Sequence, residues 1–582
     1  YQLPPVLAIR LRQQYGDGAI RVVEKNPYLL SDDVCGVDFS VTDTMALSMG
    51  FAEDCTERLE AALTFELTYN ENNGHVFLPK DKLLAATCQL LSCGIEQVEA
   101  ALDALAEHHA VVIQRIANVE AVYLRRLWEA ETSACARLLA LLEMDADEGR
   151  FADRTVAEIE KEQGITYAPL QRQAVELAAK VGVILLTGGP GTGKTTTVRG
   201  IVALFQKMGL NIVLAAPTGR AAKRMSELTG MEAQTVHRLL GMTWNEAAHQ
   251  VTFQKTEKEP LEAEAVIVDE MSMVDVSLFS ALLRALRPGC RLVLVGDPDQ
   301  LPSVGAGNVF SDLIRSGRIA TVALRDIFRQ AGQSMIVRNA HLVNTGMPPQ
   351  LKNAAANDFF FLPRRDSVRL VETVVELCKT RLPDKMGIPA EELQVLTPTR
   401  RGDAGTRSLN FALQAALNPP KPGKQERRFG ELTFREGDRV MQTRNDYDVV
   451  WQKADGTAGT GIFNGDVGKI AKIDPSGELL EIVFDDRTAT YTSDMLAELD
   501  MAYAMTVHKA QGSEYRGVVF IGAPCAPSLM VRGVLYTAIT RARELLVIVG
   551  DDSAVNKMAE NDRRSRRYSG LKWRLRKGGE EK

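Results

Sequence analysis

The feature that most constrains this chain is a glycine-rich loop between an apolar run and a helical run. The apolar run covers 183–186, the loop Gly188 to Thr195 reads GGPGTGKT, and the helical run covers 196–208. Glycines let backbone N–H groups wrap around phosphates, and the start of the following helix adds its positive end. A plain turn between strand and helix does not need the Lys194-Thr195 pair. The loop therefore predicts a nucleoside triphosphate site at the edge of a parallel sheet.

Apolar runs alternate with helical segments over most of the chain. Runs that are apolar throughout are typical of parallel sheets covered on both faces. The first group comprises 183–186, 212–215, 265–268 and 292–295. The second group comprises 393–396, 518–521 and 545–549. We therefore expect an α/β protein with two parallel sheets.

Two further segments have other patterns. Residues 437–500 are rich in glycine and alternate like β-strands, which predicts a small antiparallel barrel inserted into the second sheet. Residues 1–150 predict a mainly helical module, in which helices at 80–91 and 95–108 precede alternating strands at 110–114 and 121–124. Two helices followed by a two-stranded wing favour a winged-helix unit. The basic segment Arg563 to Lys577 is expected to be a mobile tail.

Composition narrows the class of protein. The chain has 582 residues, 45% of them hydrophobic and 25% charged, which suits a globular protein of three or four domains. No apolar run approaches the roughly 18 residues of a membrane span, so we expect a cytoplasmic protein with no membrane partner. The eight cysteines form no Cys-x-x-Cys, which argues against zinc, iron–sulfur and disulfide sites. The net charge of −6 does not exclude nucleic acid, because a motor needs only a local basic channel.

Two carboxylates and two arginines are the candidates for catalysis beside Lys194. Asp269 and Glu270 follow the run 265–268, so they lie at the ligand-binding edge of the first sheet. Asp269 and the Thr195 hydroxyl are expected to hold Mg²⁺, and Glu270 to polarise the attacking water. Sensing of the γ-phosphate across a cleft requires arginines from elsewhere, for which Arg329 and Arg541 are candidates.

The order of motifs resembles the RecD-like family of superfamily 1 DNA helicases. The matching segments are APTGRAA at 216–222, QTVH at 234–237, VGDPDQLP at 295–302, FR at 328–329, MTVHKAQGSE at 505–514 and YTAITRA at 536–542. The resemblance covers about residues 165–555. It implies two RecA-like motor domains with an SH3-like barrel, and ATP-dependent movement on single-stranded DNA, 5′ to 3′. It also implies unwinding at single/double-strand junctions, in repair or recombination.

The family also implies roles for particular residues. Gln171 reads adenine, Gln300 couples the γ-phosphate to the DNA channel, and Glu514 contacts the ribose. The expected ATP contacts are Gln171, Gly189, Pro190, Gly191, Thr192, Gly193, Lys194, Thr195, Thr196 and Glu514. The expected DNA contacts are Pro217, Thr218, His237, Thr506 and His508. Hydroxyl and imidazole groups suit phosphates and bases without sequence preference.

Two further features gain meaning from the resemblance. The segment 242–254 predicts a hairpin with a polar tip, which in this family acts as a pin that splits the duplex; an ordinary surface hairpin is the alternative. The segments at 26–28 and 36–39 resemble a helix-hairpin-helix unit. Asp38 stands where that hairpin usually has glycine. A carboxylate repels phosphate, so packing or partner docking is as good an interpretation as DNA binding.

The resulting domain prediction has five parts. They are an N-terminal module at 1–150, a first motor domain at 151–345, a second motor domain at 346–436 and 501–555, a barrel at 437–500 and a tail at 556–582. Two other functions remain open from the sequence: an ATPase that remodels protein–nucleic acid complexes, including an RNA-directed relative, and an ATP-gated clamp within a nuclease complex. Protein partners and oligomeric state also remain open.

Overall fold

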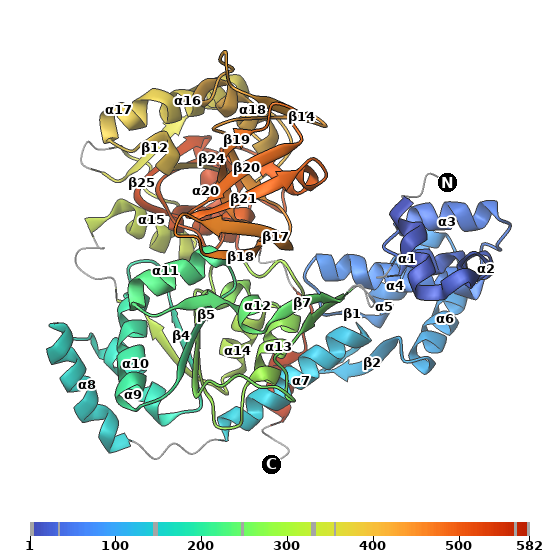
Figure 1. Cartoon of the computed structure of the whole chain (residues 1–582). Helices are drawn as coiled ribbons and strands as arrows, with labels where there is room; N and C mark the ends of the chain where they lie inside the picture. Colours follow the sequence, from blue (N-terminus) through green and yellow to red (C-terminus); the bar gives the residue numbers. More distant parts are fainter. Residues whose placement is uncertain are drawn as a thin grey trace.

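Two α/β lobes lie one above the other, and a mainly helical module extends from the lower one (Figure 1). The computed structural model describes residues 5–32, 35–143, 149–245, 250–326, 333–353, 357–563 and 567–578. The lower lobe contains the glycine-rich loop and is called the first lobe. The upper lobe contains the second group of apolar runs and is called the second lobe.

Six parallel strands form the sheet of the first lobe, in the order β11-β4-β10-β9-β5-β6. Its strands are β4 (Val183–Gly188), β5 (Ile212–Ala216), β6 (Ala233–Thr235), β9 (Ala265–Val268), β10 (Arg291–Gly296) and β11 (Ala320–Leu324). Its helices are α8 (Gly149–Gln163), α9 (Pro169–Lys180), α10 (Lys194–Lys207), α11 (Gly219–Thr229), α12 (Val236–Leu239), α13 (Val276–Ala285) and α14 (Val309–Ser316). The four predicted strands of this group are confirmed.

The second lobe has five parallel strands, in the order β12-β25-β24-β13-β23. They are β12 (Phe359–Pro363), β13 (Leu393–Thr397), β23 (Ala504–Thr506), β24 (Tyr515–Gly522) and β25 (Ala542–Gly550). The helices around them are α15 (Met335–Asn344), α16 (Ser367–Glu376), α17 (Leu382–Met386), α18 (Thr406–Leu417), α19 (Arg532–Thr540) and α20 (Asp552–Glu560). The predicted strands at 393–396, 518–521 and 545–549 lie in β13, β24 and β25 and are confirmed.

An antiparallel sheet of seven strands is inserted between β13 and β23, as the alternating pattern predicts. Its order is β18-β17-β21-β20-β19-β16-β22. The strands are β16 (Arg439–Gln442), β17 (Asp446–Lys453), β18 (Ala458–Ile462), β19 (Val467–Ile473), β20 (Leu479–Phe484), β21 (Arg487–Thr492) and β22 (Leu499–Met501), and the hairpin β14 (Glu426–Phe429) and β15 (Leu432–Arg435) precedes them. Inward side chains such as Ile470, Ile482 and Tyr491 are fully buried, because alternate residues of each strand point into the core.

The N-terminal module consists of helices and a three-stranded sheet of order β1-β3-β2. Its elements are α1 (Pro5–Tyr15), α2 (Ala19–Lys25), α3 (Phe39–Ser48), α4 (Thr56–Asn72), β1 (Phe77–Pro79), α5 (Lys80–Leu91), α6 (Ile95–Glu107), β2 (Val111–Ile116), β3 (Val119–Leu124) and α7 (Arg125–Leu142). The two predicted helices are present as α5 and α6, and the predicted strands are present as β2 and β3, which β1 extends to a three-stranded sheet. Asp38 is the N-cap of α3 and accepts from the Ser40 backbone N–H at 2.8 Å, which gives this carboxylate a structural role.

The hairpin predicted at 242–254 is present as β7 (Met242–Asn245) and β8 (Gln250–Phe253), which pair antiparallel. Its tip lies outside the described residues. The hairpin branches from the first lobe between α12 and β9, on the side where the N-terminal module extends (Figure 1).

The structure corrects the expectation of a mobile tail. Residues 571–577 form helix α21 (Leu571–Lys577), and Leu571 and Leu575 are buried in the core shared by the N-terminal module and the first lobe. Helices α7 and α14 are its neighbours. The basic residues of this segment made it resemble a solvated tail, whereas several of them have partners far away in the sequence.

The structure also moves one boundary between the lobes. Helix α15 was expected in the first motor domain, at 151–345. Its Ile336, Ala340 and Val343 instead pack into the core of the second lobe. The chain therefore crosses between the lobes before Met335.

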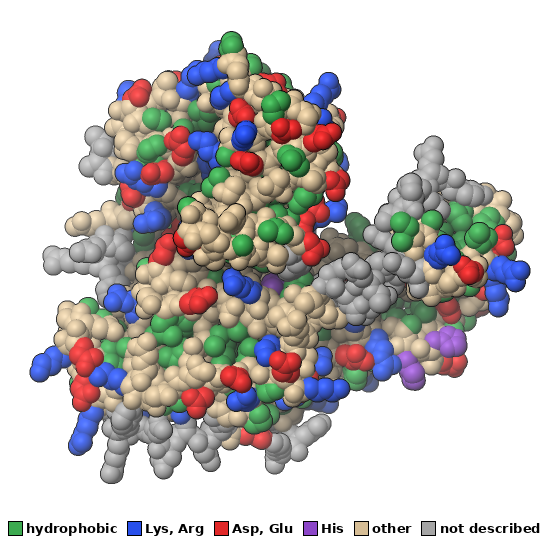
Figure 2. Space-filling model, viewed as in Figure 1, with side chains coloured by type: hydrophobic (Ala, Val, Ile, Leu, Met, Phe, Trp, Pro, Cys, Tyr) green, Lys and Arg blue, Asp and Glu red, His purple; other side chains and the backbone are tan. Residues whose placement is uncertain are grey.

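The net charge of −6 does not make the visible surface uniformly acidic. Positive and negative side chains are interspersed over both lobes on the face shown in Figure 2. Across the described residues, no helix has the length and apolar character that a membrane crossing requires.

Candidate functional site

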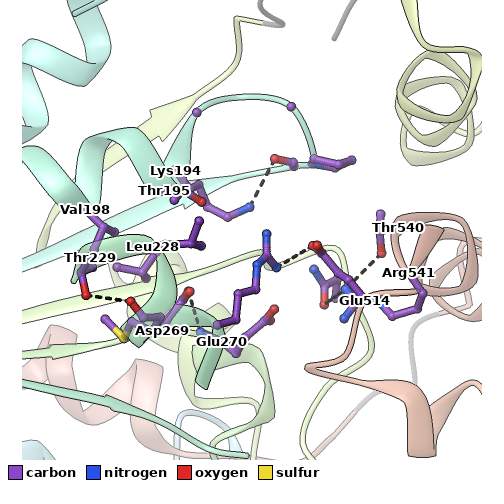
Figure 3. Close-up of a pocket in the computed structure, with 18 residues that line it drawn as sticks. Lys194, Thr195, Val198, Leu228, Thr229, Asp269, Glu270, Glu514, Thr540 and Arg541 are labelled. Atoms are coloured by element: carbon purple, nitrogen blue, oxygen red, sulfur yellow. Dashed lines mark hydrogen bonds and ion pairs between the residues drawn. The ribbon is translucent and has the colours of Figure 1, made fainter. Parts of the chain in front are cut away.

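The glycine-rich loop joins β4 to the N-terminus of α10 at the carboxyl edge of the first sheet (Figure 3). Gly191 and Gly193 have φ values of +74° and +81°, which L-residues rarely adopt, so these positions require glycine. The Lys194 ammonium donates to the carbonyl oxygens of Gly188 and, at 3.2 Å, of Gly189. It thus lies over the loop that would hold the phosphates.

Asp269 and Glu270 lie opposite this loop, directly after β9 (Figure 3). Glu270 has φ +53°, a left-handed conformation that is strained for a residue with a Cβ. Burial and the neighbouring negative charge of Glu270 raise the pKa of Asp269. A divalent cation bound beside the two carboxylates would favour their charged forms.

Oxygen donors suitable for magnesium lie near one another here. Asp269 and Thr195 line the same cavity. Mg²⁺ prefers oxygen ligands, and water or phosphate oxygens usually supply most of them. One hydroxyl and one carboxylate are therefore a typical protein contribution to its coordination. Within the described ranges there is no cluster of three His, Cys, Asp or Glu that could hold a metal without such help.

The second lobe supplies the facing wall. Arg541 follows α19 and is only 2% exposed. It donates through Nη2 to Gln300 Oε1 at 3.0 Å and through Nη1 to the Ser513 carbonyl at 3.1 Å. Its Nε is buried without a hydrogen-bond partner among the described residues. Arg541 therefore retains one donor beside the cavity.

A cavity of about 340 Å³ lies between the two walls. Its lining includes Gly189, Pro190, Gly191, Gly193, Lys194, Thr195, Asp269, Glu270, Gln300, Glu514 and Arg541. The structure thus brings together most of the residues that the sequence predicts for nucleotide binding and catalysis. Gln171, Thr192 and Thr196 are not among the lining residues, and Arg329 lies outside the described residues.

Gln171 contacts the loop from behind. Its Nε2 donates to the Gly193 carbonyl at 3.2 Å, and its Oε1 accepts from the Ala168 N–H at 3.0 Å. The side chain is 3% exposed. In this arrangement Gln171 supports the turn into α10, and both ends of its amide are used within the protein.

Two arginines of α11 contact the second lobe, and neither was predicted as a site residue from the sequence. Arg224 forms a 2.5 Å ion pair with Glu514 across the cavity, and Arg220 donates to the Tyr515 hydroxyl at 3.1 Å. The available signal was their position: Arg220 lies within the APTGRAA segment, and Arg224 lies one helical turn after Arg220. Glu514 is thus at the cavity wall, with Arg224 as its partner.

A hydrogen-bond relay connects the lobes next to the cavity. Tyr536 donates to Asp297 Oδ2 at 2.7 Å, and Gln300 Nε2 lies 3.4 Å from the same oxygen. The Leu301 N–H donates to Thr537 Oγ1, and Gln511 donates to the Leu301 carbonyl. Gln300 therefore lies in a segment that the second lobe holds directly.

The predicted DNA contacts lie at or just after the carboxyl ends of strands in both sheets. Pro217 and Thr218 follow β5, and Thr506 ends β23. Thr218 caps α11 by accepting from the Ala221 N–H, at 3.3 Å. A Cβ built on Gly512 would lie 2.7 Å from Thr218 Oγ1, so loops of the two lobes meet here.

His237 is partly buried, whereas His508 is exposed. Partial desolvation lowers the pKa of His237, and partial desolvation together with the charge of Arg567 lowers the pKa of His508. Each imidazole is thus favoured in its neutral form, which can hydrogen-bond or stack on a base without carrying a charge.

Comparisons with known proteins identify the family of the chain. The chain matches the models of an AAA domain at 171–306, an ATP-dependent RecD-like DNA helicase SH3 domain at 409–484, an ATP-dependent RecD2 DNA helicase HHH domain at 1–77 and a UvrD-like helicase C-terminal domain at 501–549. The helix-hairpin-helix and SH3-like expectations are thereby confirmed.

Two curated helicase relatives and one solved structure are similar to the chain to different degrees. The ATP-dependent RecD2 DNA helicase of Deinococcus radiodurans is 32% identical over 574 residues, covering 96% of this chain and 74% of that protein. The RecBCD enzyme subunit RecD of Mycolicibacterium smegmatis is 33% identical, covering 79% of this chain and 83% of that protein. A Bacteroides Pif1 helicase structure with ADP-AlF3 and ssDNA aligns with a TM-score of 0.42 and 19% identity, over 68% of this chain and 94% of that one. The chain belongs to the RecD-like family of superfamily 1 and is an ATP-dependent DNA helicase.

Proposed function

We propose that the cavity between the lobes is the ATP site and that its two walls divide the work of hydrolysis. The observation that carries this proposal is that residues of both lobes line one cavity. The first lobe contributes Lys194, Asp269, Glu270 and Gln300, and the second lobe contributes Arg541. Lys194 holds the β- and γ-phosphates, and Glu270 polarises the water. Arg541 and Arg329 stabilise the negative charge that develops on the γ-phosphate, and Gln300 senses that phosphate.

Magnesium belongs to the same proposal. Thr195 and Asp269 hold it, and the bound ion supplies charge neutralisation to the phosphates. The glycine-rich loop, with Gly189 to Thr196, binds the phosphates through its N–H groups, and Glu514 and Gln171 contact the nucleoside. Both side chains must exchange their present partners, Arg224 and the Gly193 carbonyl, to do so.

The DNA path runs over the carboxyl edges of both sheets, past Pro217, Thr218, His237, Thr506 and His508. ATP binding closes the lobes and hydrolysis releases them, so each cycle advances the protein along one strand. We assign 5′-to-3′ movement, single/double-strand junctions as substrate, and the hairpin β7–β8 as the pin that separates the strands. The cytoplasm and DNA repair or recombination are the proposed setting.

Arg541→Ala tests the two-walled site. An arginine finger contributes about 10³- to 10⁵-fold in rate, so DNA-stimulated kcat should fall by a large factor within that span. Arg543→Ala is the matched control, because Arg543 lies two positions further on and is exposed. Equal kcat in the two variants would refute the assignment of Arg541. Strand displacement on duplexes with a 5′ or a 3′ single-stranded tail tests the direction, and unwinding of only the 3′-tailed substrate would contradict it.

A further inference from the structure

The last described segment of the chain ties three parts of the molecule together. We call residues 567–578 the C-terminal strap. The chain leaves the second lobe after α20, and the strap then docks on the first lobe and the N-terminal module. In Figure 1, this red segment lies beside α7 at the bottom of the first lobe, far from the rest of the red strands.

A buried ion pair anchors the far end of the strap. Glu131 of α7 is 0% exposed and lies 3.0 Å from Arg574 Nε. The same carboxylate accepts from the backbone N–H groups of Gly570 and Leu571 and from the Tyr123 hydroxyl, at 2.8, 2.9 and 3.0 Å. The Glu131 carboxylate can remain charged in this buried site because these donors offset the cost of removing it from water. The strap therefore has one defined position on the N-terminal module.

The near end of the strap inserts Arg567 into the loop Ser303–Gly307. Arg567 Nη1 donates to the Gly305 and Gly307 carbonyls at 2.9 and 2.7 Å, and Nη2 donates to the Ser303 carbonyl at 2.6 Å. Burial lowers the pKa of Arg567 to about 10, which still leaves it charged at neutral pH. The guanidinium passes so close to Gly74 that a Cβ there would lie 2.3 Å from Arg567 Cζ.

This loop directly follows the predicted γ-phosphate sensor. Gln300 is followed by Leu301 and Pro302, and then by Ser303. The second lobe holds Leu301 through Thr537 and Gln511, and the strap holds the residues immediately after it. The segment that carries Gln300 is therefore fixed on its C-terminal side by two separate anchors, of which Arg567 is one.

We propose that Arg567 is a positioning residue for the coupling of DNA binding to ATP hydrolysis. Its guanidinium fixes the loop Ser303–Gly307, and this loop fixes the orientation of Gln300 toward the ATP cavity. Gln300 is the residue proposed to couple the γ-phosphate to the DNA channel, so loss of the support that Arg567 gives to this loop should weaken the stimulation of hydrolysis by DNA.

The inference rests on the proposed role of Gln300, and ATPase assays with and without a dT oligonucleotide test it. For Arg567→Ala we expect DNA-stimulated kcat to fall about tenfold, with the DNA-free rate and the ATP KM within about twofold of the parent. The DNA-stimulated kcat of Arg567→Lys should lie between those of the parent and of Arg567→Ala, because one ammonium cannot reproduce the bonds of both Nη atoms. A purely structural role would lower both rates together, in proportion to the folded fraction.

Arg576→Ala is the matched control. Arg576 belongs to the same strap but donates to the carbonyls of Ser316 and Arg315 at the end of α14, away from the loop. It should keep the ratio of stimulated to DNA-free rate. The inference is overturned if Arg567→Ala also keeps this ratio, or if both rates fall with the folded fraction measured by thermal melting.

Gln300→Ala distinguishes a failure of the role proposed for Arg567 from a failure of the role proposed for Gln300. If it loses the DNA stimulation and Arg567→Ala does not, only the role of Arg567 is wrong. If Gln300→Ala keeps the stimulation, the proposed role of Gln300 fails and the inference fails with it.

Discussion

Breaking the buried pair Glu131–Arg574 should destabilise the protein far more than an ordinary loss of charge. Arg574→Ala leaves the Glu131 carboxylate at 0% exposure, without its cation. Removing one partner of such a pair typically costs about 3–5 kcal/mol in the free energy of unfolding. We expect that range, because the remaining donors to Glu131 are neutral hydroxyl and backbone groups.

Two measurements check this value. The amides of Gly570 and Leu571 donate to Glu131, so their hydrogen exchange should accelerate strongly in Arg574→Ala. Urea unfolding followed by the fluorescence of Trp128 and Trp573 gives the free-energy change, since Trp573 belongs to the strap and Trp128 packs against the same core.

Two variants separate the ion pair from other effects. The double variant Glu131→Gln with Arg574→Met should recover much of the loss, because no buried charge is left alone. Arg576→Ala removes two hydrogen bonds to backbone carbonyls, one exposed and one partly buried, and leaves no buried charge unpaired, so it should cost about 1 kcal/mol. A loss below about 1 kcal/mol in Arg574→Ala is the value of a surface pair and would refute the docking of the strap.

Three further outcomes follow from the structure. Deletion of 245–249 at the hairpin should leave DNA-stimulated ATP hydrolysis intact and abolish strand separation; equal unwinding by the deletion would show that the hairpin is no pin. Burial raises the pKa of both Cys290 and Cys378 to about 12, so neither should react with a thiol reagent at pH 8 until the protein is unfolded, and rapid labelling of the native protein would contradict this. Tyr536→Phe removes the 2.7 Å bond to the buried Asp297 and should weaken closure of the lobes by about 1–3 kcal/mol, seen as a higher ATP KM; an unchanged KM would argue against a role in closure.

The sequence predicted the parts of the fold that depend on local pattern. Runs such as 265–268 are apolar because both faces of a parallel sheet are covered, and this requirement is visible in any strand taken alone. The helix at Lys80–Leu91 was predicted at its observed bounds from its amphipathic spacing. The glycine-rich loop was predicted because its chemistry is contained in consecutive residues.

Long-range pairing was not predictable in the same way. Arg574 looks like any residue of a basic tail until Glu131 is placed beside it, and those two positions share no local pattern. The same holds for Arg224 and Glu514, which meet only because two lobes face each other. Helix α15 was assigned to the wrong lobe because its apolar face is compatible with either core.

The most direct test of the central claim is Lys194→Ala, assayed for DNA binding, ATP hydrolysis and unwinding in parallel. We expect DNA-stimulated ATP hydrolysis and strand separation both to be lost, because no other group can replace the Lys194 ammonium at the phosphates. DNA binding should be largely retained, since the DNA loops do not depend on this side chain. Strand separation by Lys194→Ala at the parent rate would contradict the account.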